Sequence, residues 1–216
     1  MTTLTIPARF NGPPGSGHGG VSCGLLAQAT GLNEITLRLP PPLEVPLEVR
    51  DGGLYDGDLL VAQGAAGEVA ATAPAVVPLE EAREAVSRYR GHEGHPFPTC
   101  FACGPQHPTG LHLFPGEVGD GVVACPWVPE DDDPVMVWAA LDCPGAWSND
   151  PTQEAIVLGR LTMRLGRLPV PGEEHVLMGW RRGRAGRKVL TGTALYTADG
   201  ELLAVTEQTW ITVPVS

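Results

Sequence analysis

Two stretches of the chain carry residues whose chemistry suits attack on a carbonyl group. Residues 12–28 form a Gly- and Pro-rich turn that leads through His18, Gly19 and Gly20 into an apolar run. Glycine allows the backbone to come close to a ligand, and the first turn of a helix offers unpaired N–H groups at its positive dipole end. This loop is therefore a candidate for holding a carbonyl oxygen against backbone donors. The alternative is a flexible turn before a core helix.

Asp142 is the second candidate. It follows the almost wholly apolar residues 135–141, in a predicted helix that starts with acids at 131–133 and Pro134. Burial on such a helix is expected to raise the pKa of the carboxyl group, and the residue is then suited to act as a general base or nucleophile. The alternative is an acid that bonds nearby backbone before Pro144, which we expect to kink or end the helix. We expect His18 to position groups rather than to act as a base.

A serine nucleophile is a competing hypothesis. Gly20, Ser22 and Gly24 match the G-x-S-x-G pattern of nucleophile elbows. That motif requires a strand directly before it, and here the segment PPGSGHGG precedes it. The chain also lacks the alternation of strands and helices of an α/β-hydrolase, so we disfavour this interpretation.

Four potential zinc ligands follow in one segment: His92, His95, Cys100 and Cys103. One Cys-x2-Cys with nearby histidines leaves two interpretations open, a zinc site or a packed linker with buried cysteines. We assign neither a metal nor a cofactor from the sequence. The odd count of five cysteines does not indicate a disulfide framework, and Cys23 and Cys143 are expected in the core.

Charge limits the choice of partners. The net charge of −11 disfavours nucleic acid and anionic membranes. No apolar run is long enough to span a membrane, and the N-terminal residues do not form a signal peptide, so we expect a cytoplasmic protein. Positive charge is nevertheless concentrated in one short stretch, which is either a phosphate-binding site or a solvated hairpin tip: Arg181, Arg182, Arg184, Arg187 and Lys188.

The elements that must position these residues occur twice. Each half contains an apolar helix, predicted at 19–30 and from 134, followed by strands of alternating pattern. ITLRL at 35–39 matches LTMRL at 161–165, and residues 57–62 match 200–205. The first copy is shorter and is predicted to lack most of the strand expected at 188–197. A helix predicted at 78–90 and a linker at 91–98 place the boundary between units 1–91 and 92–216.

This arrangement resembles the double-hotdog acyl-CoA thioesterases, in which each antiparallel sheet wraps a central helix. The resemblance rests on His18-Gly19-Gly20, on the CGP and PTGL segments at 103–105 and 108–111, and on Leu141-Asp142. It implies an α+β fold of two hotdog units packed as a pseudo-dimer, and hydrolysis of an acyl-CoA or acyl-carrier-protein thioester. It also makes Trp138 a candidate for the acyl pocket, the arginine-rich stretch a candidate for the phosphates of the carrier, and a homodimer possible.

The sequence departs from that family in one informative way. The related thioesterases carry an acid nine residues after the histidine of the HGG motif, and here that position is Ala27. The second helix has Asp142, but nine residues before it stands Asp133 rather than a histidine. We therefore predict one composite site, with residues 18–20 of one unit opposite Asp142 of the other. The alternatives are a hotdog protein that binds an acyl group or small ligand without catalysis, and a divergent hydratase or dehydratase. No histidine follows an aspartate at the hydratase spacing.

Overall fold

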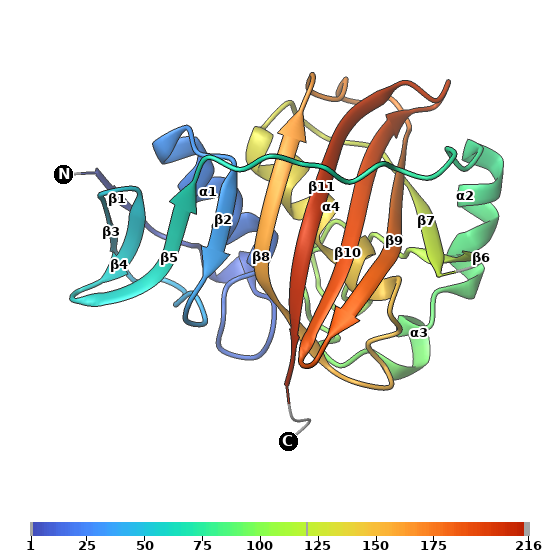
Figure 1. Ribbon diagram of the computed structural model, residues 1–216. Coiled ribbons are helices and arrows are strands. Elements are labelled where there is room, and N and C mark those ends of the chain that lie inside the picture. Colours follow the sequence, from blue (N-terminus) through green and yellow to red (C-terminus); the bar gives the residue numbers. More distant parts are fainter. Residues whose placement is uncertain (1, 120, 214–216) are drawn as a thin grey trace.

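A single antiparallel sheet runs through the whole molecule, and two helices lie together on one of its faces (Figure 1). The computed structural model describes residues 2–119 and 121–213. Within them the sheet has eleven strands in the order β1-β3-β4-β5-β2-β8-β11-β10-β9-β7-β6. The fold is therefore α+β, as the sequence predicted.

The first unit supplies one half of the sheet and one helix. Its helix α1 spans Gly19–Thr30 and ends at Gly31, whose φ of 73° is the left-handed conformation that glycine adopts at helix ends. Its strands are β1 (Thr2–Leu4), β2 (Glu34–Leu37), β3 (Leu47–Arg50), β4 (Gly53–Asp56) and β5 (Leu59–Ala65), with a 3-10 turn η1 at Ala8–Phe10.

The second unit is larger. Its helix α4 spans Pro134–Trp147, with Asp133 as the N-cap. Its strands are β6 (Gly116–Gly119), β7 (Val122–Trp127), β8 (Ile156–Leu165), β9 (His175–Ala185), β10 (Lys188–Thr197) and β11 (Leu202–Thr212). The four long strands at the C-terminal end match the predicted ones within a few residues.

The repeat appears in the order of strands. Outward from the centre, β2, β5, β4 and β3 mirror β8, β11, β10 and β9, and the two halves join where β2 pairs antiparallel with β8. The four-residue β4 occupies the place of the ten-residue β10. The first copy thus lacks most of the strand that β10 supplies in the second, as expected, and keeps a short version of it. Neither β4 nor β6 was placed from the sequence.

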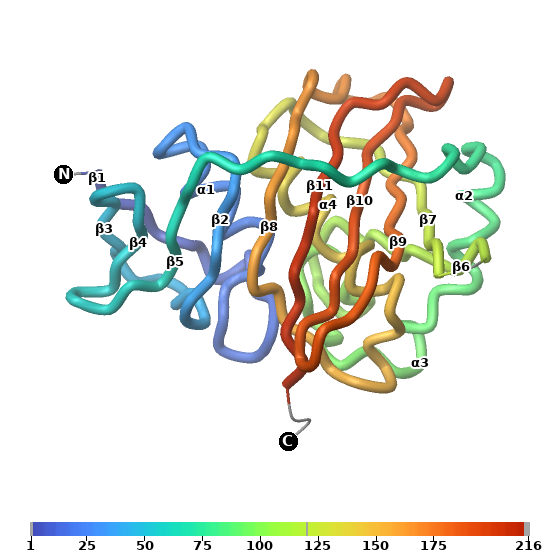
Figure 2. The backbone as a smooth tube through the Cα atoms, viewed as in Figure 1, coloured from blue at the N-terminus to red at the C-terminus, as the bar shows by residue number. Residues whose placement is uncertain are grey.

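Between the two units the chain crosses the other face of the sheet (Figures 1 and 2). Residues 66–78 run over it and lead into α2 (Leu79–Ala85), η2 (Val86–Arg88) and α3 (Gly91–Gly94). Ala71, Val77 and Ala82 of this segment pack against Val176 and Met178 of β9. We expected the helix at 78–90 to trail the first unit, and the contacts of α2 are with β6, β7 and β9 of the second. The boundary at residue 91 stays a prediction.

Pro144 was expected to kink or end the helix that carries Asp142. It does not end α4, so that part of the prediction is wrong. The helix continues to Trp147 although proline donates no N–H to the helix. The carbonyl that loses its helical donor is that of Ala140, four residues before the proline. The neighbouring carbonyl of Leu141 is bonded from the sheet, by Thr193 Oγ1 at 2.7 Å and Gln208 Nε2 at 2.6 Å. Two buried polar side chains of β10 and β11 therefore hold the helix in place just before Pro144.

Candidate active site

His18 is fixed by its place at the start of α1. It is the N-cap of the helix, and its Nδ1 accepts the backbone N–H of Val21 at 3.3 Å. Ser22 Oγ donates to the His18 carbonyl at 2.8 Å. The side chain is buried, with 2% of the residue exposed. Because Nδ1 accepts a hydrogen bond, a neutral His18 ring carries its proton on Nε2, which points away from α1.

The helices α1 and α4 cross in close contact, and glycines make this possible. A Cβ atom on Gly20 would lie 2.5 Å from the Trp138 carbonyl oxygen and 2.8 Å from Asp142 Cβ. One on Gly24 would lie 3.0 Å from both Val135 Cα and Trp138 Cβ. The small residues let the backbone of α1 approach α4, with the start of one helix beside the end of the other. The glycines of the HGG motif thus have a packing role in addition to any contact with a ligand.

This crossing brings the two halves of the predicted composite site together. Asp142 Oδ2 accepts the backbone N–H of Gly20 at 2.7 Å and lies 3.4 Å from His18 Nε2. The other carboxylate oxygen, Oδ1, is buried and has no hydrogen-bond partner among the described residues. An unpaired buried carboxylate oxygen is costly, so this atom is available to a water molecule or a substrate group.

Burial dominates the electrostatics of the pair. It raises the pKa of Asp142 from 3.8 to about 6, against the lowering effects of His18 and the Gly20 N–H bond. For His18, burial lowers the pKa, but the neighbouring Cys100 and Asp142 raise it and the net direction is upward. The carboxyl group of Asp142 therefore changes charge near neutral pH, which is where a general base is useful.

A narrow pocket of about 60 Å³ gives access to the pair. His18, Gly19 and Asp142 line one side of it, and Ile156, Leu158 and Trp210 contribute an apolar wall. The N–H of Gly20 is taken by Asp142, whereas the N–H of Gly19 has no hydrogen-bond partner among the described residues. Gly19 is therefore the donor of the HGG loop that remains free for a carbonyl oxygen.

The pseudo-symmetric position across the helix pair lacks these groups. There Asp133 caps α4 through a bond from Val135 N–H at 2.9 Å, as His18 caps α1. The residue in the place of Asp142 is Ala27. A larger pocket of about 1070 Å³ opens at this end, lined among others by Ala27, Gln28, Pro134 and Trp138. Trp138, predicted to bind substrate, is thus on this side and does not line the pocket of His18.

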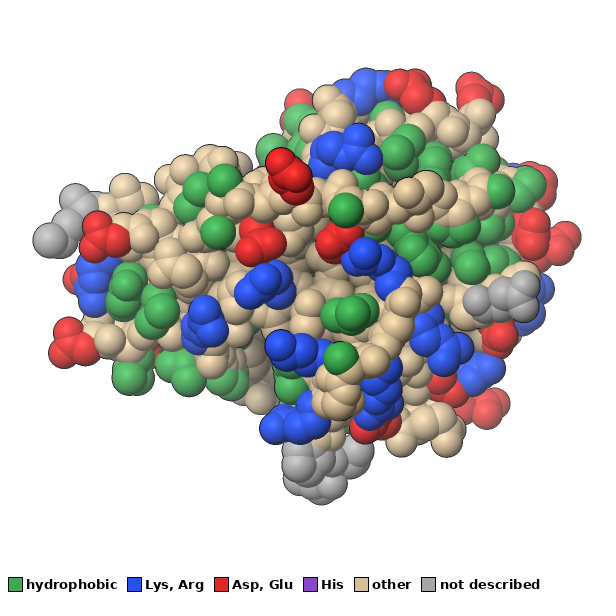
Figure 3. All heavy atoms as spheres, in the orientation of Figure 1, with side chains coloured by type: hydrophobic (Ala, Val, Ile, Leu, Met, Phe, Trp, Pro, Cys, Tyr) green, Lys and Arg blue, Asp and Glu red, His purple; other side chains and the backbone are tan. Residues whose placement is uncertain are grey.

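The five basic residues of the β9–β10 hairpin do not form one cluster. Arg182 pairs with Glu207 at 3.0 Å, and Arg184 pairs with Glu154 at 2.7 Å. The remaining three are also dispersed: Arg187 donates to the Thr212 carbonyl at 3.1 Å, Arg181 lines a separate pocket with Arg88 and Arg90, and Lys188 is exposed at the start of β10. Figure 3 shows Lys and Arg side chains spread over the lower part of the sheet.

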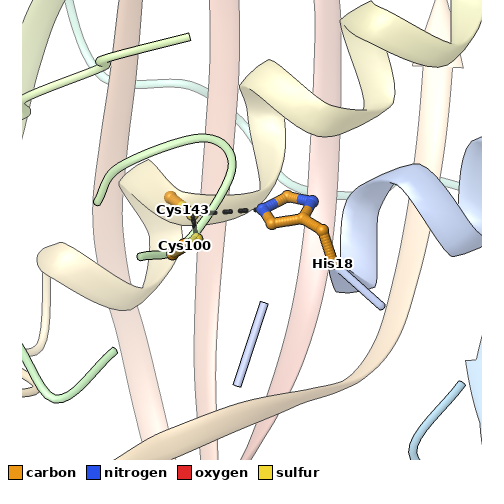
Figure 4. A group of neighbouring side chains, drawn as sticks. All are labelled: His18, Cys100 and Cys143. Carbon is orange, nitrogen blue, oxygen red and sulfur yellow. Dashed lines mark hydrogen bonds between the residues drawn. The ribbon is translucent and has the colours of Figure 1, made fainter. Parts of the chain in front are cut away.

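The sulfur atoms were the main feature that the sequence did not locate. Cys143, expected to be plain core, lies beside His18, with 3.4 Å between Sγ and Nε2 (Figure 4). Its Sγ is 3.8 Å from that of Cys100, which is 3.6 Å from that of Cys103. His95 joins this group, with Nε2 3.2 Å from Cys103 Sγ. His92 does not, because its ring packs on Tyr89 and Phe114.

Gln208 and Thr193 were also missed, although they position the end of α4. Their signal is weak in the sequence, because threonine and glutamine also occur on exposed strand faces, and only the structure shows that these two are buried. They bond the carbonyl that directly precedes Asp142, and so fix the turn of helix that carries the carboxylate.

Comparison with known proteins supports the architecture. No family model matches the sequence, and no curated protein matches it. Among solved structures, a protein from Novosphingobium aromaticivorans, provisionally named a thioesterase, aligns over 98% of this chain and 95% of its own, with a TM-score of 0.63 and 16% identity. A hot dog fold protein of unknown function from Alicyclobacillus acidocaldarius aligns over 98% and 92%, with a TM-score of 0.60 and 14% identity.

The chain has a double-hotdog fold. A tesB protein of Mycobacterium avium subspecies paratuberculosis also aligns over 98% of the chain and 91% of its own, with a TM-score of 0.57 and 14% identity. The resemblance to thioesterase-superfamily proteins is thereby confirmed at the level of fold. In the described part of this hotdog chain, none of the helices has both the length and the hydrophobicity needed to cross a bilayer.

Proposed function

We propose that this double-hotdog protein hydrolyses an acyl thioester at the composite site formed by His18, Gly19 and Gly20 with Asp142. The observation that carries the proposal is the unpartnered Oδ1 of Asp142, a buried carboxylate oxygen of a residue that lines the same pocket as Gly19, whose N–H at the helix start is free. A general base and an oxyanion donor are the two groups that hydrolysis of a thioester requires.

The reaction follows from these positions. Asp142 Oδ1 accepts a proton from a water molecule, whose oxygen attacks the thioester carbon. The Gly19 N–H stabilises the negative charge that develops on the carbonyl oxygen. When the C–S bond breaks, the proton held by Asp142 passes to the leaving sulfur, so the products are a carboxylic acid and a thiol. His18 holds its Nε2 beside Oδ2, and Gly20 donates to the same oxygen, which leaves Oδ1 as the reactive atom.

The substrate we infer is an acyl-CoA or acyl-carrier-protein thioester. Arg187 and Lys188 lie at the turn where β10 begins, and β10 pairs there with the end of β11 that carries Trp210 of the pocket wall. Like Arg181, they are not held by an acidic partner among the described residues, whereas Arg182 and Arg184 are. We assign them to the phosphates of the carrier, while pairing of two chains and a cytoplasmic location stay predictions.

The test is a panel of acyl-CoAs of different chain lengths, with release of the free thiol as the readout. We expect Asp142→Asn to lower kcat by about 10²- to 10⁴-fold, the usual contribution of general base catalysis. Asp133→Asn is the matched control, because it alters an acid of the same helix that lies outside the pocket and asparagine also caps helices. Hydrolysis that persists unchanged in Asp142→Asn would refute the role of Asp142.

A ligand-binding protein without catalysis is the second candidate. It is favoured by the pocket of about 1070 Å³, which is far roomier than the one at His18 and has Ala27 where a catalytic acid would stand. In that case no thioester is hydrolysed by the wild-type protein, yet acyl ligands bind. Substitution of Trp138 by alanine then weakens binding, whereas Asp142→Asn leaves it unchanged.

A further inference from the structure

Three cysteines from two parts of the second unit meet beside the candidate active site. Cys100 and Cys103 belong to the loop before β6, and Cys143 to the last turns of α4. All three are buried, with at most 5% of each residue exposed. The distances between sulfur atoms are 3.6 Å for Cys100 and Cys103 and 3.8 Å for Cys100 and Cys143.

We propose that Cys100, Cys103 and Cys143 bind a thiophilic metal ion, Zn²⁺, with the imidazole of His95 as the fourth ligand. Zinc bound tetrahedrally through Zn–S bonds of about 2.3 Å holds its sulfur ligands about 3.8 Å apart. The two separations agree with that value. The ligand atoms that already lie within 4.8 Å of one another are those of His18, Cys100 and Cys143, so the ion would draw Cys103 Sγ and His95 Nε2 closer to the other two sulfurs. Three cysteines and one histidine form one of the usual donor sets of closed, structural zinc sites.

The loop is built to direct both of its thiols to one side. Cys-x2-Cys is followed by Gly104, whose N–H bonds the Cys100 carbonyl at 2.8 Å and closes the turn. A Cβ atom on Gly104 would lie 2.4 Å from Cys100 N and 2.5 Å from Pro98 O, so the turn requires glycine. Tyr89 Oη donates to the Cys103 carbonyl at 2.7 Å and fixes the other end of the motif.

Two histidines border the cluster, and Nδ1 of each accepts a backbone N–H. His95 Nε2 lies 3.2 Å from Cys103 Sγ, and this residue is in the same segment as the Cys-x2-Cys turn. His18 Nε2 lies among Cys100, Cys143 and the Asp142 carboxylate, and its Nδ1 caps α1. Because His18 Nε2 also faces Asp142 Oδ2, at 3.4 Å, we assign His95 to the metal and His18 to a hydrogen bond onto Cys143 sulfur (Figure 4). If His95 binds the metal through Nε2, its ring proton must sit on Nδ1. Nδ1 then no longer accepts the hydrogen bond that Phe97 N–H donates to it in this structure.

Zinc binds cysteine as the thiolate, and three thiolates this close would repel one another without a cation. The divalent charge of the ion would offset that repulsion. The ion would also tie the loop of residues 95–104 to α4 next to Asp142. This loop supplies His95, Phe97 and Cys100 to the wall of the narrow pocket, so the ion would hold one wall of the candidate active site.

The test is the metal content of the full chain, purified without chelators from zinc-supplemented cells. We expect about one zinc per chain, falling to less than about a tenth in Cys100→Ser, Cys103→Ser and Cys143→Ser. Cys125→Ser is the matched control, because Cys125 is equally buried but lies on β7 away from the cluster, and it should keep the metal.

A second test uses the wild-type protein, so that the metal site can be tested even if a cysteine variant fails to fold. After removal of zinc and addition of Co²⁺, we expect thiolate-to-cobalt charge-transfer absorption and the visible bands of a tetrahedral site. His95→Ala should shift those bands, and His18→Ala should not. Wild-type protein that carries no zinc and takes up no cobalt, or that shows a Cys100–Cys103 disulfide by intact mass, would overturn the site. Bands that shift in His18→Ala alone would overturn the assignment of His95. None of these readouts depends on thioester hydrolysis.

Discussion

Replacement of Asp142 by asparagine should stabilise the protein at neutral pH while it removes the proposed activity. The carboxyl group is fully buried, and its pKa in the folded chain is about 6 against 3.8 for an unperturbed aspartate. A folded-state pKa above the unfolded one means that ionisation opposes folding. The wild type therefore loses stability as pH rises from about 4 to above 6, and asparagine, which cannot ionise, does not.

The magnitude follows from the two pKa values. A difference of about 2 units corresponds to about 3 kcal/mol of destabilisation once the group is fully ionised in both states, at about pH 8. At about pH 4 the same two values leave only about 0.6 kcal/mol. Asparagine can still accept the Gly20 N–H bond through its Oδ1. The gain in the free energy of unfolding should therefore grow with pH.

The assay is urea denaturation of wild type and Asp142→Asn at both pH values, so that the titration of all other groups largely cancels in the difference. Asp133→Asn is measured in parallel and reports any effect of pH that is unrelated to the buried carboxylate. A gain that is the same at both pH values, or a loss of stability at pH 8, would refute the reasoning that ionised Asp142 opposes folding.

Three further outcomes are expected. The kcat/KM for thioester hydrolysis should rise with pH and level off above about pH 6, because Asp142 acts as a base only when ionised; a profile that falls over this range would contradict the assignment. Gly20→Ala should cost about 1–3 kcal/mol in urea denaturation, since its Cβ would meet the backbone of α4, whereas Gly183→Ala, which has open space around it, should cost far less. Gln208→Ala should cost about 1–3 kcal/mol by leaving a main-chain carbonyl of α4 short of a partner; a neutral effect would show that Thr193 alone satisfies it.

Local signals were enough to predict the two central helices and most long strands, but not α3, which lies where a linker was expected. Helix α1 was expected at 19–30 and is found at Gly19–Thr30, because a turn rich in glycine precedes it and Gly31 ends it. The internal repeat predicted two similar units, and the mirrored strand order confirms it. The short strands β4 and β6 were missed because four residues carry too little alternation to be distinguished from a turn.

The missing acid at Ala27 led to the prediction of a composite site. The distances and contacts within that site could not be predicted from the sequence. The sequence determined which residues have the chemistry: a histidine with two glycines at a helix start, an acid in an apolar helix, and a Cys-x2-Cys turn. Only the tertiary structure decided which of them meet, because antiparallel packing of α1 on α4 sets residues more than a hundred positions apart at hydrogen-bond distance. The same packing places Trp138 outside the pocket of His18 and adds Cys143 to the Cys100 turn. The local sequence determines which side chains are available. Which of them lie close together depends on how α1 crosses α4, and that crossing depends on packing against the whole sheet.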